Sequence, residues 1–280
     1  MIRRLDGLLQ GDYRTMFYGQ GLDLADIREY QPHDDVRYID WNVTARMDTP
    51  YVRQYLEDRE ITAYFLCDLS PSLDFGTVRS DKRAVLADVV AVLARLLTRH
   101  GNRVGAILYG GSVERSIPAG GGKLQVLRLL DEIAKRPRLA SAPYTALGDL
   151  LETAARTIRR RSLVFIVSDF FSVPGWDRPL GMLGRRHDVV VVRVSDPRER
   201  ELPDIGWVAM TDSETGEQIV LDTNDKRFRA RFTEVVARHE AALRAAFRRA
   251  GVDVLAVSTE DDLVRSIVAF AQERRLCRRH

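Results

Sequence analysis

From about residue 61 onward, the chain alternates between short apolar runs and longer amphipathic stretches. The short runs are rich in β-branched residues and predict buried strands at 61–67, 103–109, 163–168, 189–194 and 252–257. The longer stretches carry apolar residues three and four positions apart and predict helices at 82–99, 124–135 and 146–159. Strands that alternate with helices predict an α/β fold with a mostly parallel central sheet and helices on both faces.

Two later segments depart from this alternation. Residues 207–222 predict a β-hairpin insertion, because two short apolar runs flank a turn that contains Gly216. Residues 225–250 predict one long helix that stops at Gly251. We expect the aromatic residues of its apolar stripe to belong to the core. The stripe consists of Phe228, Phe232, Val235, Val236, Leu243 and Phe247.

The first 60 residues lack clear helical or strand periods and are dense in charged and aromatic side chains. Tryptophan, tyrosine and arginine at such density usually pack against protein or bind a partner. We therefore predict an N-terminal extension at 1–60 that packs on a main domain at 61–280. Direct contact with a partner is the alternative role, and the residues expected to make it are Arg28, Tyr30, Arg37, Asp40, Trp41 and Arg46.

The charged residues nearly balance, with 43 Lys and Arg against 40 Asp and Glu, for a net charge of +3. This small surplus gives no argument for nucleic acid, and we expect none to bind. The N-terminal residues lack the apolar core of a signal peptide, and no apolar run approaches the length of a membrane span. We expect a cytoplasmic protein with no membrane span in this chain. Any membrane association would be peripheral, through a membrane-bound partner.

Oxygen-bearing side chains follow two of the predicted strands. Asp68, Ser70 and Ser72 come after the run at 61–67, Asp169 follows the run at 163–168, and Thr145 precedes a predicted helix. Parallel strands end at one edge of the sheet, which is where open α/β sheets bind ligands. Carboxylate and hydroxyl oxygens favour Mg²⁺, with Mn²⁺ and Ca²⁺ as alternatives. The sequence therefore predicts a divalent-metal site at this edge.

Two other interpretations of these residues remain open. In a metal-free structural scaffold they would be helix caps or loop residues. In a Mg²⁺-dependent phosphohydrolase or nuclease, Asp68 and Asp169 would carry the chemistry. An aspartyl-phosphate phosphatase needs a second Asp two residues after its nucleophile as general acid, and this chain has Ser70 there. Because a serine hydroxyl is a poor proton donor, a binding site without enzymatic activity is the preferred hypothesis.

The spacing of these five side chains also matches a known motif. Asp-x-Ser-x-Ser at a strand end, then a Thr before a helix, then an Asp after a later strand, resembles the metal-ion-dependent adhesion site of von Willebrand factor A domains. The matching residues are Asp68, Ser70, Ser72, Thr145 and Asp169. The resemblance implies that these residues hold Mg²⁺ directly or through water. It also implies that an acidic residue of a partner completes the coordination.

A second resemblance covers more of the chain. Residues 21–46 and 51–55, with 74–76, Lys82 and 102–105, resemble the signature of the bacterial family called domain of unknown function 58. This resemblance implies a role as adaptor or co-chaperone of a MoxR-type AAA+ ATPase. We therefore expect a protein partner, either that ATPase or its client.

Overall fold

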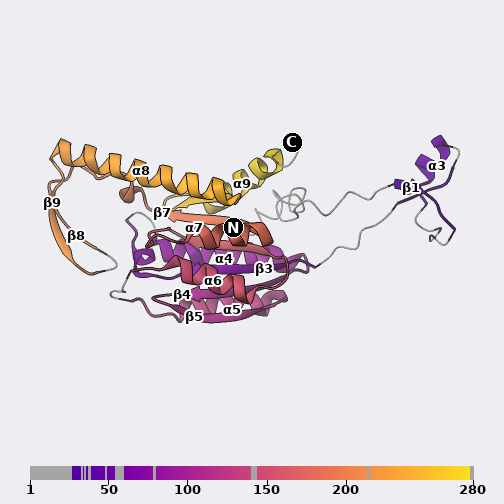
Figure 1. Ribbon diagram of the computed structural model, residues 1–280, viewed down its shortest axis with the longest axis horizontal. Helices are drawn as coiled ribbons and strands as arrows, with labels where there is room; N and C mark the ends of the chain where they lie inside the picture. Colours follow the sequence, from indigo (N-terminus) through magenta and orange to yellow (C-terminus); the bar gives the residue numbers. More distant parts are fainter. Residues whose placement is uncertain are drawn as a thin grey trace.

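A six-stranded sheet in the order β10-β7-β6-β3-β4-β5 forms the centre of the protein (Figure 1). The computed structural model describes residues 27–277, with gaps at 33, 35, 37–38, 48, 54–59, 78–79, 140–143 and 213–214. All neighbouring strands of this sheet pair in parallel except β5, which runs antiparallel to β4. The predicted mostly parallel α/β fold is confirmed. The strands are β3 (Thr62–Asp68), β4 (Arg103–Tyr109), β5 (Val113–Gly120), β6 (Leu163–Ser168), β7 (Asp188–Ser195) and β10 (Asp253–Ser258).

Helices cover both faces of the sheet and create two cores. One core contains α4 (Lys82–Arg99), α5 (Gly122–Ala134) and α9 (Leu263–Cys277). The other contains α6 (Leu147–Thr157), α7 (Asp177–Arg186) and α8 (Lys226–Ala250). The alternation of side chains along a strand explains the division, since Phe65 and Cys67 of β3 lie in the first core and Leu66 in the second.

The ends of the helices follow local signals in the sequence. Asp81 caps α4 by accepting a hydrogen bond from Ala84 N at 2.7 Å, the usual role of Asp at this position. Asp225 caps α8 in the same way, and Gly251 ends α8 with a φ of 65°, a left-handed conformation that glycine adopts readily. No helix within the described ranges has both the length and the apolar character of a bilayer span.

Most predicted elements form where the sequence placed them. The helix at 82–99 and the strands at 103–109 and 163–168 coincide with α4, β4 and β6. The predicted hairpin forms as β8 (Trp207–Thr211) and β9 (Gln218–Asp222), which pair antiparallel. The edge strand β5, the helices α7 and α9, and the short 3₁₀ helices η2 (Pro71–Asp74) and η3 (Pro197–Glu199) were not predicted.

The prediction that the aromatic residues of the α8 stripe belong to the core is wrong for its N-terminal half. Leu243 and Phe247 are buried, but Phe228 and Phe232 are only half-buried and Val235 is 52% exposed. Figure 1 shows the reason, since the N-terminal half of α8 extends beyond the sheet toward the hairpin β8–β9. The apolar face of α8 therefore continues beyond the part of the helix that the sheet covers.

Residues 27–53 contain a small unit of their own. β1 (Ile27–Glu29) pairs antiparallel with β2 (Tyr51–Arg53), and α3 (Trp41–Met47) lies between them in sequence. The joining residues 54–59 and the first 26 residues lie outside the described part of the chain. The domain boundary at residue 60 and the packing of the extension on the main domain stay predictions.

Candidate metal centre

Asp68 and Ser168 are brought together because β3 and β6 are parallel neighbours. Cys67 pairs with Val167, so the next residues of the two strands end side by side. Ser168 Oγ donates to Asp68 Oδ2 at 2.6 Å, and Ser70 N donates to Asp68 Oδ1 at 3.0 Å. Asp68 is fully buried. Both of its oxygens are therefore held in place by the two strand ends.

The two serines of the motif lie next to each other in the loop after β3. Ser70 Oγ and Ser72 Oγ are 3.2 Å apart, and both residues are buried. Ser70 precedes the short helix η2, but its side chain makes no capping hydrogen bond. Ala146, and not Thr145, is the N-cap of α6. Ser70 thus occupies the N-cap position of η2 without a side-chain capping bond, and the interpretation of Thr145 as a helix cap is wrong.

Thr145 belongs to a third loop, which hydrogen bonds attach to the other two. Ala146 N donates to the Tyr109 hydroxyl at 2.9 Å, and the Tyr109 carbonyl accepts from Leu69 N at 2.6 Å. On the other side, Ser172 Oγ donates to the Thr145 carbonyl at 2.8 Å. Thr145 itself is 2% exposed. The structure thus places the loops that carry all five predicted ligands at one edge of the sheet.

The backbone beside this edge adopts an unfavourable conformation at two points. In the described part of the chain, the non-glycine residues with positive φ are Tyr144, at 28°, and Phe170, at 60°. Each directly adjoins a predicted ligand, Thr145 or Asp169. A non-glycine residue held in this region costs on the order of 1–3 kcal/mol, and such strain clusters at functional sites.

Asp169 carries a contact that the sequence analysis did not foresee. Lys82 Nζ lies 2.6 Å from Asp169 Oδ2 and also contacts Glu199 Oε1. The other oxygen, Asp169 Oδ1, accepts from Phe171 N at 3.0 Å. The Lys82 side chain is only 1% exposed. Lys82 appeared in the sequence only as part of a family signature, and Glu199 and Ser168 gave no signal, because their roles depend on contacts between distant segments.

The electrostatics of the site reflect its burial. Burial, and secondly the charge of Asp169, raise the pKa of Asp68 to about 6, against the opposing hydrogen bonds from Ser168 and Ser70. Burial disfavours the charged form of Lys82, but Asp169 and Glu199 outweigh it, so the pKa of Lys82 is raised. Burial likewise raises the pKa of Glu199, although Lys82 opposes this change. The edge therefore holds buried negative charge that Lys82 neutralises only in part.

This donor set fits a hard divalent cation. Asp68 and Asp169 are fully buried carboxylates, and the loops at this edge also carry the buried hydroxyl residues Ser70, Ser72 and Thr145. Across the described residues, no three side chains of His, Cys, Asp or Glu gather into a metal-binding group. A metal at this edge would thus rely on hydroxyl oxygens and water as well as carboxylates, which is the chemistry of Mg²⁺, Mn²⁺ or Ca²⁺.

The residues expected to contact a partner lie in the N-terminal unit, except Arg37, which falls outside the described residues. Arg28 pairs with both carboxylate oxygens of Asp34, at 2.7 and 2.6 Å. Asp40 caps α3 by accepting from the backbone at 3.0 Å, and Tyr30 N donates to the Pro50 carbonyl. Trp41, at 70% exposure, and Arg46 project from α3. Arg28 and Asp40 thus have structural roles, whereas Trp41 and Arg46 remain open to solvent.

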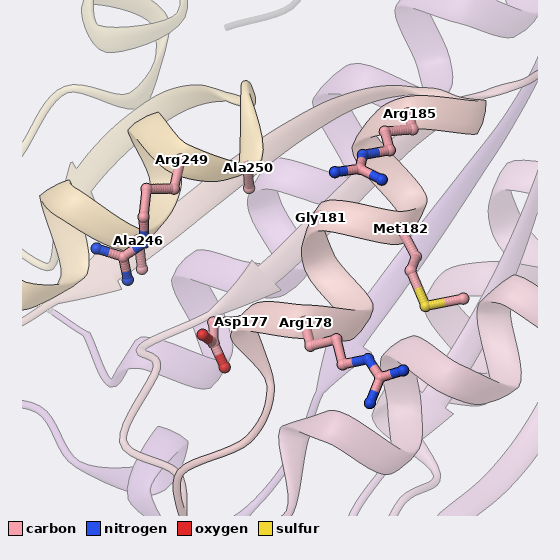
Figure 2. Close-up of a pocket in the computed structure, with 8 residues that line it drawn as sticks. All are labelled: Asp177, Arg178, Gly181, Met182, Arg185, Ala246, Arg249 and Ala250. Carbon is pink, nitrogen blue, oxygen red and sulfur yellow. The ribbon is translucent and has the colours of Figure 1, made fainter.

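A separate pocket of about 410 Å³ lies between α7 and the C-terminal end of α8 (Figure 2). It contains none of the predicted ligands, and its charged residues include Arg178, Arg185 and Arg249. Figure 2 shows the side chains of Arg178 and Arg249 extending to different sides. Arg185 and Arg249 stand in the last turns of their helices, where cations complement the helix dipole. The strand ends, and not this pocket, therefore carry the candidate site.

The fold and the site together define a class of protein. A mostly parallel α/β sheet with Asp, Ser, Ser, Thr and Asp at its carboxyl edge is the arrangement of a von Willebrand factor A-like domain. The family described as "Protein of unknown function DUF58" matches residues 26–242. The chain belongs to this family, as the signature from Gly21 onward predicted.

Mycobacterial relatives support this membership. The chain is 38% identical over 277 residues to uncharacterized protein Rv1480 of Mycobacterium tuberculosis, covering 98% of this chain and 86% of the relative. Uncharacterized protein Mb1516 of Mycobacterium bovis matches to the same extent. A shorter uncharacterized protein of Mycobacterium avium is 38% identical over 162 residues, or 57% of this chain and 94% of that protein.

Two crystal structures share the fold. One is an aerotolerance-related membrane protein from Bacteroides fragilis, with a TM-score of 0.52 and 16% identity over 78% of this chain and 99% of that chain. The other is BatB from Bacteroides thetaiotaomicron, with a TM-score of 0.50 and 12% identity over 76% of this chain and 98% of that chain. At these identities the similarity concerns the fold alone.

Proposed function

We propose that this protein is a metal-dependent protein-binding module without enzymatic activity, in which Asp68, Ser70, Ser72, Thr145 and Asp169 hold Mg²⁺. One observation carries the proposal: three separate loops converge at one edge of the sheet and bury five oxygen-bearing side chains there. Mn²⁺ and Ca²⁺ suit the same oxygens.

The charges of the site favour a partner that supplies a carboxylate. Two carboxylates only just neutralise a divalent ion, and hydroxyls and water add no charge, so the bound ion would remain a Lewis acid for an external acidic group. The residues support binding more than hydrolysis. Ser70 stands where a phosphatase would need an acid, and the nearby Asp74 is paired with Arg83 at 2.6 Å.

The sequence resemblance supports a MoxR-type AAA+ ATPase, or its client, as the partner, with this protein acting as adaptor or co-chaperone. We place this role in the cytoplasm, with no nucleic acid involved and with any membrane contact made through the partner.

Metal binding can be tested through stability. A ligand that binds only the folded state at 100 times its Kd adds about 2.7 kcal/mol to the free energy of unfolding. We expect Mg²⁺ to stabilise the wild type against urea by this amount, but not Asp169→Ala. Asp131→Ala is the matched control, because Asp131 lies on α5 and its side chain is 55% exposed. If Mg²⁺ stabilised the wild type and Asp169→Ala equally, the proposed metal site would be refuted.

Partner binding needs a test that does not chelate metal, because an AAA+ ATPase itself requires Mg²⁺ with its nucleotide. We therefore propose pull-down of a purified MoxR-type ATPase at constant Mg²⁺ and ATP. Thr145→Ala should weaken capture, whereas Thr157→Ala, on the exposed end of α6, should not. Full capture by Thr145→Ala would contradict metal-mediated binding. Phosphatase and nuclease assays with Mg²⁺ or Mn²⁺ should be blank for the wild type, and turnover lost in Asp68→Asn would favour the enzyme.

A further inference from the structure

Lys82 is an ammonium group buried inside the proposed metal centre. It begins α4, its side chain is 1% exposed, and its Nζ contacts Asp169 and Glu199. Two aromatic rings also face the charge, with Nζ 5.3 Å from the centre of Phe171 and 5.8 Å from the centre of Phe75. A charge removed from water this completely is tolerated only when it is paired. Lys82 is therefore a fixed part of the site and not a mobile surface lysine.

The position of Lys82 conflicts with a metal ion at Asp169. Asp169 Oδ1 already accepts from Phe171 N, and the ammonium takes Oδ2. A divalent ion bound to Asp169 would have to share Oδ2 with the Lys82 ammonium. Two cations bound to the same oxygen in a buried site repel each other strongly. The ammonium and the ion are thus alternatives at this oxygen.

Glu199 offers the ammonium a second carboxylate that stays in place. Glu199 Oε2 accepts from Asp196 N at 2.9 Å. Asp196 in turn accepts from Thr77 Oγ1 at 2.6 Å and from Thr259 Oγ1 at 2.7 Å. These bonds tie η3 to two neighbouring loops, so Glu199 can hold Lys82 without help from Asp169.

We propose that Lys82 is a built-in competitor of the metal ion, which occupies Asp169 in the metal-free protein and is retained by Glu199 when the ion binds. This inference rests on the proposed metal site and adds its regulation: the affinity of the site is set by how strongly the ammonium holds Asp169. The exchange breaks the hydrogen bond from Lys82 to Asp169 but no covalent bond, and it needs no proton transfer, since one cation replaces another beside the same carboxylate.

The first test measures Mg²⁺ affinity by calorimetry for the wild type and Lys82→Gln. Glutamine can still donate a hydrogen bond toward Asp169 but carries no charge, so Mg²⁺ should bind about tenfold more tightly or better. Lys135→Gln is the matched control and should leave the affinity unchanged, because Lys135 is the C-cap of α5 and its side chain is 66% exposed. If Lys82→Gln does not fold, Lys82→Gln/Glu199→Gln, compared with Glu199→Gln, tests the same change.

A second measurement observes the ammonium directly. The sequence has four lysines, so protein labelled with ¹⁵N-lysine gives a simple spectrum in which Lys82→Gln identifies the buried signal. Mg²⁺ should shift the Lys82 signal and leave that of Lys135 in place. Glu199→Gln should weaken Mg²⁺ binding several-fold, and by less when Lys82 is already replaced, because the displaced ammonium then needs no partner.

The outcomes separate this inference from the proposed function. Mg²⁺ that binds the wild type and Lys82→Gln equally, or leaves the Lys82 signal unmoved, overturns the competition while the metal site stands. If Glu199→Gln lowers the Mg²⁺ affinity by as much or more in the Lys82→Gln background as in the wild type, the role of Glu199 is overturned. Mg²⁺ that binds Lys82→Gln but not the wild type supports strong competition. If Mg²⁺ binds neither protein, the metal site and the competition both fall.

Discussion

Replacing Asp68 by asparagine should stabilise the metal-free protein. Asp68 is fully buried. Burial, and secondly the charge of Asp169, raise its pKa from 3.8 to about 6. A carboxylate whose pKa is raised by folding destabilises the folded state at neutral pH, because it must be charged where charge is disfavoured. A neutral amide of nearly the same shape removes this cost.

The size of the effect follows from the pKa and the hydrogen bonds. The difference between 3.8 and about 6 corresponds to about 3 kcal/mol at neutral pH. Ser168 Oγ, which now donates to Asp68 and accepts from Phe170 N, would have to accept from the new amide. Its own proton would then lose its acceptor, at a cost of about 1 kcal/mol. We expect a net gain of about 1–2 kcal/mol.

The gain should depend on pH in a defined direction. Because the pKa of Asp68 is higher in the folded state, its stabilising contribution is fully present below pH 3.8 and is lost as the pH rises through about 6. The variant lacks this titration, so its advantage should shrink by about 2 kcal/mol between about pH 7.5 and about pH 4.5. Urea unfolding in EDTA at both values measures the difference, with the exposed Asp131→Asn as control.

Two results would refute the reasoning. If the variant is less stable than the wild type at about pH 7.5, the hydrogen bonds to Asp68 outweigh its desolvation. If its advantage is the same at both pH values, the gain does not come from this carboxylate. With Mg²⁺ present the order should reverse, because the wild type gains the binding energy of the ion and Asp68→Asn loses most of it.

Other substitutions test the fold through urea unfolding. Gly251→Ala should cost about 1 kcal/mol, because φ is 65° there, whereas Gly181→Ala, inside α7 with open space around it, should gain about 0.5–1 kcal/mol; equal effects would contradict the conformational argument. Phe247→Ala should lower the free energy of unfolding by about 3–5 kcal/mol, since the residue is 3% exposed. Phe232→Ala should lower it clearly less, because Phe232 is only half-buried. Asp196→Ala should cost about 2 kcal/mol, because several donors lose their acceptor; an unchanged midpoint would show that these bonds are exchangeable with water.

The sequence predicted the elements whose signals are local. α4 carries its own cap in Asp81 and an uninterrupted apolar stripe, and β4 and β6 are apolar runs buried on both faces. β5 gave no such signal, because it is an edge strand with mostly exposed residues and contains Pro118. The prediction was wrong for the half-buried stripe near Phe232. An amphipathic period indicates a helix, but it does not indicate how much of the helix the neighbouring elements cover.

The site was predictable to the same limit. Asp68, Ser70 and Ser72 share one loop and a recognisable spacing, and Thr145 and Asp169 each stand beside a predicted element. These residues converge because of the order of the strands in the sheet. The sequence predicted the class of fold but not that strand order. Lys82 and Glu199, separated by 117 positions, meet through tertiary packing. No spacing rule connects residues so far apart in the chain.

The in-register pairing of β3 with β6 gives the site a particular sensitivity to insertions and deletions. Cys67 lies opposite Val167, and the side chains of a strand alternate between the two cores with a period of two. Removing one residue from the middle of either strand would exchange its apolar side chains between the cores or carry Asp68 away from Ser168. Length changes in these strands are therefore excluded even where individual side chains can vary, and variation in chain length should concentrate in connections such as the one between β8 and β9.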